Sequence, residues 1–130
     1  MKNIFLILVI IFLGCSESSE EPNNIPNELI GKWKIDEIFT TEGGSPATWS
    51  SYDSGEIYDI WLKENGTYID VNTDENCNNG TYIITENQIT FSPCASLYPL
   101  TIEKLMKDTL ILRDNFIPDI FKTKYLKIIE

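Results

Sequence analysis

The sequence contains no histidine, and this absence removes a large class of chemistry. Ser-His-Asp and Cys-His nucleophilic systems both need an imidazole base, and imidazole is the commonest metal ligand in proteins. Nothing else in the sequence pairs a nucleophile with a base. We therefore expect no catalytic residue, no metal site and no cofactor, and we predict that the protein is not an enzyme.

Basic residues are also scarce. Ten Lys and Arg stand against twenty Asp and Glu, which gives a formal net charge of −10 at pH 7. Nucleic acids and anionic membrane surfaces are recognised by clustered Lys and Arg side chains. We therefore expect no nucleic-acid partner.

Acidic side chains are abundant, and two groups of them suggest chemistry. Asp53, Glu56 and Asp59 lie close together, but nothing marks a pair of carboxylates in opposed environments, as acid–base catalysis requires. We interpret them as a solvated acidic rim. Residues 70–76 carry oxygen atoms at alternate positions but lack the glycine and bidentate glutamate of an EF-hand loop, so we interpret them as a strand that runs into a polar loop.

No apolar run reaches the roughly 20 residues that a membrane-spanning helix needs. The longest, Ile4–Leu13, follows Lys2 and ends at Gly14. A short positive start, an apolar core of this length and a small residue at its end are typical of a secretory signal peptide. An ordinary signal peptide and a buried apolar segment are the alternatives to the interpretation that follows.

The segment from Phe12 to Cys15 resembles the lipobox of bacterial lipoproteins, although Phe12 stands where leucine is usual. The resemblance implies removal of residues 1–14, a lipid anchor on Cys15 and a location in the cell envelope as an outer-membrane lipoprotein. Residues 15–26 have almost nothing to bury, so we expect an acidic, disordered tether. This tether is similar to the export signal of surface lipoproteins in Bacteroidetes-type bacteria; a plain spacer is the alternative.

Two cysteines remain once Cys15 carries a lipid. Cys77 and Cys94 would then lie in an oxidising compartment, where paired thiols tend to be bridged. We expect a disulfide between them, with free buried thiols as the alternative.

Hydrophobic periodicity predicts one domain, residues 27–130, built from short strands. The connections are short, so each strand should lie beside its predecessor, and eight such strands favour closure because a barrel leaves no exposed edge. We predict an all-β, eight-stranded antiparallel up-and-down barrel, with residues 41–55 as a long loop at one end. The expected strands are Lys32–Thr40, Glu56–Glu64, Thr67–Thr73, Gly80–Thr85, Gln88–Pro93, Tyr98–Leu105, Thr109–Arg113 and Phe121–Ile129.

The turn at Asn65-Gly66 allows two strand registers. A two-residue type I′ turn pairs Leu62 with Ile69, whereas a three-residue loop with a bulge places Leu62 opposite Tyr68 and reverses the inner and outer faces of the returning strand. We prefer the first register because it places Ile69, and not Asp70, on the buried face.

The first strand carries a family resemblance. Gly31-Lys32-Trp33 resembles the Gly-x-Trp start of lipocalin-type barrels, and the segments 62–68 and 80–84 are similar to strand-turn patterns of bacterial lipocalin-like lipoproteins. The resemblance implies that Gly31 and Trp33 close the bottom of the barrel and that a basic side chain near the last strand stacks on Trp33. Arg113 falls one strand too early for this role, which leaves Lys124 or Lys127.

The same resemblance implies a small, mostly apolar ligand inside the barrel. Tyr82 and Phe91, paired by a turn at Glu86-Asn87, and Tyr58 are expected on inward faces, while Trp49 and Tyr52 would guard the mouth. The alternative is a barrel filled by its own side chains. In that case the protein would be an interaction or accessory protein that presents its acidic loop to another envelope protein.

Overall fold

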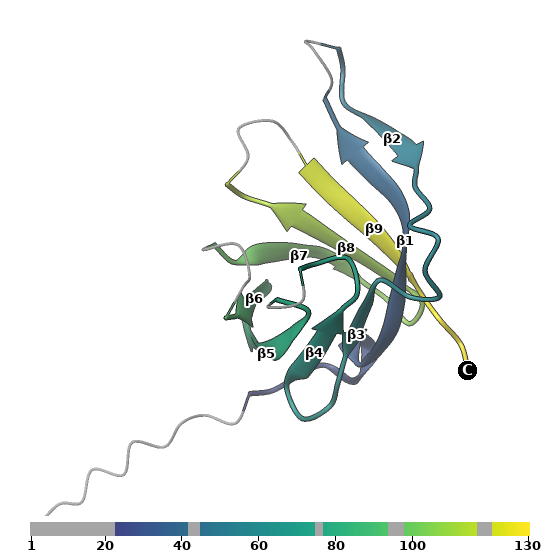
Figure 1. Ribbon diagram of the computed structural model, residues 1–130. Coiled ribbons are helices and arrows are strands. Elements are labelled where there is room, and N and C mark those ends of the chain that lie inside the picture. The colour runs from purple at the N-terminus through teal and green to yellow at the C-terminus, as the bar shows by residue number, and fades with distance from the viewer. Residues whose placement is uncertain (1–22, 42–44, 75–76, 94–97, 117–120) are drawn as a thin grey trace, which may run out of the picture.

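The computed structural model describes residues 23–41, 45–74, 77–93, 98–116 and 121–130. Within these ranges the chain is all-β, with a single 3-10 turn, η1 (Asn27–Leu29), before the first strand (Figure 1). No helix in the same ranges is both long enough and apolar enough to span a membrane. The strands are β1 (Gly31–Thr40), β2 (Thr48–Ser51), β3 (Ile60–Leu62), β4 (Thr67–Asp70), β5 (Asn79–Thr85), β6 (Gln88–Ser92), β7 (Leu100–Leu105), β8 (Thr109–Asp114) and β9 (Phe121–Lys127).

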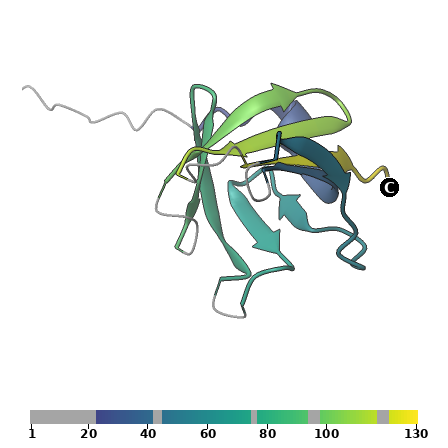
Figure 2. The ribbon, with the colours of Figure 1, turned by 90° about the horizontal axis from the view of Figure 1, so that it is seen from above.

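The strands close into a barrel. From β4 to β9 each strand pairs antiparallel with its predecessor, β1 pairs with both β3 and β9, and β2 lies outside the ring on the edge of β1. Eight strands therefore surround one interior. The two views show how the strands curve around it (Figure 1 and Figure 2). This confirms the predicted fold class.

Part of the expected loop 41–55 is a strand. β2 pairs with Glu37–Thr40 of β1, and all four of its residues are exposed. The pairing of β1 with β3 ends at Trp33, so the outer half of β1 would otherwise present an open edge. The hairpin of β1 and β2 covers that edge and projects beyond the barrel (Figure 1).

The preferred register of the β3–β4 hairpin is wrong. Leu62 pairs with Tyr68 and Ile60 with Asp70, as the three-residue alternative requires. Gly66 has φ +79°, a left-handed conformation that suits glycine at such a bulge. Tyr68 is buried as a result, and the side chain of Asp70 turns to the inside of the barrel.

The β5–β6 hairpin has the predicted register. Tyr82 pairs with Phe91, Ile84 with Ile89, and the connection is the two-residue turn at Glu86-Asn87. Tyr82 and Ile89 are buried. Cys94, which follows this hairpin, lies outside the described residues, so the disulfide with Cys77 stays a prediction.

One end of the barrel is filled by side chains. At this closed end Trp33 is wholly buried, and its Nε1 donates a hydrogen bond to the carbonyl oxygen of Leu29 at 2.8 Å. The Nζ atom of Lys127 lies 4.8 Å from the centre of the Trp33 ring, and burial lowers the pKa of this amine. Lys127 thus occupies the position that the resemblance assigned to a basic residue. The other wholly buried apolar side chains are Leu29, Leu62, Tyr82, Ile89 and Leu110.

Gly31 is needed for this closure. Its φ of +142° lies in a region that other residues rarely adopt, and a Cβ atom there would come within 3.3 Å of the Lys127 side chain. The Nζ of Lys127 also donates to the carbonyl oxygens of Glu28 and Ile30, at 2.6 and 2.9 Å. Glycine therefore lets the last strand and the entering chain meet at the closed end.

Candidate functional site

The interior at the opposite end of the barrel holds a cavity of about 240 Å³. The walls come from the ends of β4, β6 and β8, the starts of β3 and β7, β9 and the segment after β4, and Trp33 is not among the lining residues. Apolar and aromatic side chains make most of the wall, and the polar side chains gather among them. The lining residues are Ile60, Tyr68, Asp70, Thr73, Cys77, Phe91, Leu100, Leu112, Asp114 and Tyr125.

A larger hollow of about 570 Å³ lies along the outer side of β4 and β5. Its wall includes Thr67 and Ile69, which flank the inward-facing Tyr68 and therefore point away from the barrel interior. We take the interior cavity as the candidate site because it combines apolar walls with convergent polar groups, as small-molecule sites do.

Strand alternation explains how the lining is built. Along β8, Leu110, Leu112 and Asp114 occupy alternate positions and share the inward face. Leu110 fills the closed end, Leu112 forms the floor of the cavity, and Asp114 reaches its wall. On β4 the same alternation brings Tyr68 and Asp70 inward. Two carboxylates therefore enter the cavity from different strands.

Asp70 lies in an environment that disfavours its charged form. Burial raises its pKa above the usual range, and the nearby charge of Asp59 raises it further, whereas the hydrogen bond from Asn72 acts in the opposite direction. The Asn72 backbone N–H donates to Asp70 Oδ1 at 2.9 Å. Asp114 Oδ1 accepts a hydrogen bond from the backbone N–H of Phe116 at 2.8 Å. Each carboxyl group thus has a defined position at the end of its strand.

No basic side chain of the described residues compensates these carboxylates. All Lys and Arg residues except Lys2 lie in the described ranges, and none of them lines the cavity. The ion pairs of the described residues lie outside the cavity; Lys124, for example, pairs with Asp36 and Glu37, and Lys122 pairs with Glu103. The cavity is therefore a negatively charged, largely apolar pocket.

Tyr125 adds a phenol to the same wall. Burial raises the pKa of its hydroxyl group, and the charges of Asp70 and Asp59 raise it further. The group therefore remains protonated and can donate or accept a hydrogen bond. Tyr68 and Phe91 stand edge to face on the facing wall, with ring centres 4.9 Å apart.

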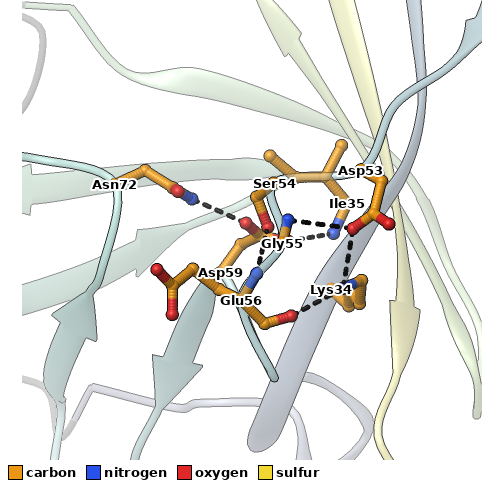
Figure 3. Close-up of polar contacts among 8 residues, drawn as sticks. All are labelled: Lys34, Ile35, Asp53, Ser54, Gly55, Glu56, Asp59 and Asn72. Carbon is orange, nitrogen blue, oxygen red and sulfur yellow. Dashed lines mark hydrogen bonds and ion pairs between the residues drawn. The ribbon is translucent and has the colours of Figure 1, made fainter.

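Asp59 does not line the cavity but connects the segments next to it through hydrogen bonds. Only 1% of its surface is exposed, and its two carboxylate oxygens accept hydrogen bonds from Ile35 N at 2.5 Å and Asn72 Nδ2 at 2.7 Å (Figure 3). Its backbone N–H donates to the carbonyl oxygen of Trp33 at 2.8 Å. The residue therefore joins β1, the segment before β3 and the segment after β4.

The interpretation of Asp53, Glu56 and Asp59 as one solvated rim is wrong for Asp59. Asp53 is exposed, and hydrogen bonds from Gly55 and Lys34 lower the pKa of its carboxyl group. Lys34 Nζ lies 3.0 Å from Asp53 and donates to the carbonyl oxygen of Glu56 at 2.6 Å (Figure 3). Two of the three residues thus remain at the surface, and the third turns into the protein.

The aromatic residues predicted to bind a ligand are dispersed. Phe91 lines the cavity. Tyr82 belongs to the filled end, where its hydroxyl donates to the Lys63 carbonyl oxygen at 2.7 Å and burial raises its pKa to about 12. Tyr58 packs against Trp61, with ring centres 6.4 Å apart, and does not line the cavity.

The two aromatics expected at the mouth lie on the outside of the barrel. Trp49, on β2, packs against Phe39 with ring centres 5.1 Å apart and is 38% exposed. Tyr52 borders a surface groove beside Leu126 of β9. Another aromatic pair lies just beyond the strands, with Tyr98 before β7 and Phe116 after β8. The two rings are stacked, with ring centres 4.3 Å apart, and both side chains are exposed.

Comparison with known proteins identifies the family. The model of the lipocalin-like domain matches residues 29–112, which is more than half of the chain. Searches of curated proteins and of solved structures found no match to this chain. The match covers the Gly-x-Trp start, the closed end and most strands that line the cavity. The chain belongs to the lipocalin-like domain family.

Proposed function

We propose that this protein is a membrane-anchored lipoprotein whose barrel binds a small ligand at its open end. The observation that carries the proposal is the cavity of about 240 Å³ between Phe91, Leu100 and Leu112, with two carboxylates in its wall. An accessory protein with a filled barrel would need no such space. The filled half around Trp33 provides rigidity, and the open half provides the binding site.

The volume limits the size of the ligand. Sites for drug-sized molecules measure roughly 300–1,000 Å³, so a cavity of about 240 Å³ suits a smaller molecule, such as one aromatic ring with a short side chain. Ile60, Leu112 and Phe91 would bury the ring, and the polar groups would orient the side chain. A long lipid tail does not fit within this volume.

Filling the cavity should abolish binding. We expect Leu100→Trp to weaken binding of a one-ring probe about ten-fold or more, because the indole would occupy ligand space at the start of β7. The probes are indole, 2-phenylethanol, phenethylamine and 3-phenylpropionate, titrated calorimetrically into the full chain in a nonionic detergent.

The matched control is Leu126→Trp. Leu126 is 39% exposed on the outer face of β9, so the same increase in volume there should leave binding unchanged. Failure of every probe to bind the unmodified chain would refute the proposed function. Equal binding by the unmodified chain and Leu100→Trp would show that the probe binds elsewhere.

The anchor can be tested by the intact mass of the protein purified from membranes. We expect a chain that begins at Cys15 and carries a diacylglyceryl group, lighter by a pair of hydrogen atoms if Cys77 and Cys94 are joined. Cys15→Ala should abolish the lipid mass and release the protein from the membrane fraction. An unprocessed chain that begins at Met1 would contradict the lipoprotein part of the proposal. Ligand binding would still be decided by the probe titration.

A further inference from the structure

We infer that the ligand carries a cationic group, such as a primary amine, which binds Asp70 and Asp114 while its apolar part lies against the aromatic wall. This inference rests on the proposed function and names the chemical class of the ligand. The cavity has an unusual composition: apolar walls, two carboxylates and no basic side chain among the described residues.

A carboxylate turned toward an apolar interior costs free energy unless a partner compensates it. The register of β3 and β4 creates this cost, since the other register would place Ile69 inside and Asp70 outside. Within the described residues Asp70 receives one backbone hydrogen bond but forms no ion pair. A ligand ammonium would supply the missing opposite charge through charge-assisted hydrogen bonds.

The second carboxylate, Asp114, lines the cavity from a strand that does not neighbour β4. Asp70 and Asp114 stand on β4 and β8, and their strands are separated by β5, β6 and β7 around the barrel. A cation between them would be approached from two directions. Both residues therefore line one cavity from different sides of the barrel, unlike a cluster of acids on a surface loop.

The aromatic groups suit the same ligand. The rings of Tyr68 and Phe91 offer apolar contact, and the negative face of an aromatic ring also attracts a cation. The Tyr125 hydroxyl provides a further hydrogen-bonding group on the wall formed by β9. An amine attached to a single aromatic ring offers this lining both an apolar face and an ammonium group.

The same charges exclude anionic ligands. A fatty acid or another carboxylate would place a third negative charge beside Asp70 and Asp114. The net charge of −10 also favours the approach of cations and opposes that of anions. The structure therefore assigns this lipocalin-like barrel to a cationic ligand and not to a fatty acid.

Three probes with the same ring and different side-chain charge test the inference: phenethylamine, 2-phenylethanol and 3-phenylpropionate. We expect the full chain at pH 7 to bind the amine about ten-fold or more tightly than the alcohol, and the carboxylate more weakly than either. Asp70→Asn and Asp114→Asn should each remove most of the preference for the amine while binding of the alcohol changes little. Both asparagines keep the oxygen that accepts the backbone hydrogen bond, and thermal melts verify that the variants fold.

Asp108→Asn is the matched control, because Asp108 is exposed in the turn between β7 and β8, at the closed end. It removes the same charge and should leave the preference for the amine unchanged. Equal binding of amine and alcohol would overturn the inference and leave the proposed function standing. An amine preference that survives both cavity variants, or falls equally in Asp108→Asn, would overturn the assignment of Asp70 and Asp114. If none of the probes binds, both proposals fail.

Discussion

Replacing Trp33 with alanine is expected to lower the free energy of unfolding by about 3–5 kcal/mol, the range for large aromatic side chains removed from a core. The side chain is wholly buried, donates a hydrogen bond to Leu29 and lies beneath the ammonium group of Lys127. Its removal leaves a cavity at the closed end and removes the ring on which that cation rests. Denaturant unfolding of the full chain, followed by circular dichroism, measures the loss.

Trp49→Ala is the control for this prediction. It removes the same side chain from the exposed strand β2, where Trp49 contacts Phe39 outside the barrel. We expect a loss of about 1 kcal/mol or less. Similar losses for the two variants would contradict the assignment of the closed end as the stabilising half of the barrel.

Replacing Asp59 with alanine is expected to lower the free energy of unfolding by about 2–3 kcal/mol at pH 7. The variant leaves the Ile35 backbone N–H without its acceptor and removes the acceptor of the Asn72 amide. Hydrogen bonds to charged groups contribute more than neutral ones, and an unsatisfied buried donor carries the full desolvation cost. Urea unfolding measures the effect.

Two further variants separate the hydrogen bonds from the negative charge. Asp59→Asn keeps one acceptor, and the Asn72 amide can rotate to accept from the new one, so we expect a smaller loss than for alanine. Asp53→Ala removes an exposed carboxylate from the neighbouring segment and should change stability little. Equal losses in Asp59→Ala and Asp53→Ala would contradict the structural role of Asp59.

The sequence was sufficient to predict the barrel because its strands carry local signals. Alternating apolar residues and turn residues set the positions of β5 and β6, and the two-residue turn at Glu86-Asn87 determines their register. The strand β2 was not predicted because its position depends on a distant feature. It forms where the edge of β1 is left open beyond Trp33, and this gap follows from the three-dimensional closure of the barrel.

The candidate site was predicted only in part, since most of it depends on one register. The rule that apolar residues face inward favoured Ile69, but the three-residue turn at residues 64–66 placed Tyr68 and Asp70 inside. Departures from such a local rule are expected at functional or strained sites. Phe91 was found because its hairpin obeys the rule. Asp114 was detectable in principle, as the next alternate position after Leu110 and Leu112.

Asp59 could not be predicted because its partner is a backbone group in β1. The pairing of β1 with β3 ends at Trp33, and its pairing with β2 begins at Glu37. Ile35 lies between these stretches, so no strand accepts its N–H on that edge. Asp59 fills the gap by donating its own N–H to Trp33 and accepting from Ile35 through its carboxylate. A buried backbone donor needs such a partner, whatever its sequence position.

The most direct test of ligand binding in the cavity is a two-dimensional ¹H–¹⁵N NMR titration of the full chain in detergent with phenethylamine. We expect saturable shifts grouped at Ile60, Asp70, Phe91 and Asp114, with the indole N–H of Trp33 at the closed end unchanged. Asp70→Asn should reduce the shifts at a given concentration, and Asp108→Asn should not. Shifts confined to Trp49 and Tyr52 on the outer surface, or no saturable shift with phenethylamine and 2-phenylethanol alike, would contradict a binding site inside the barrel.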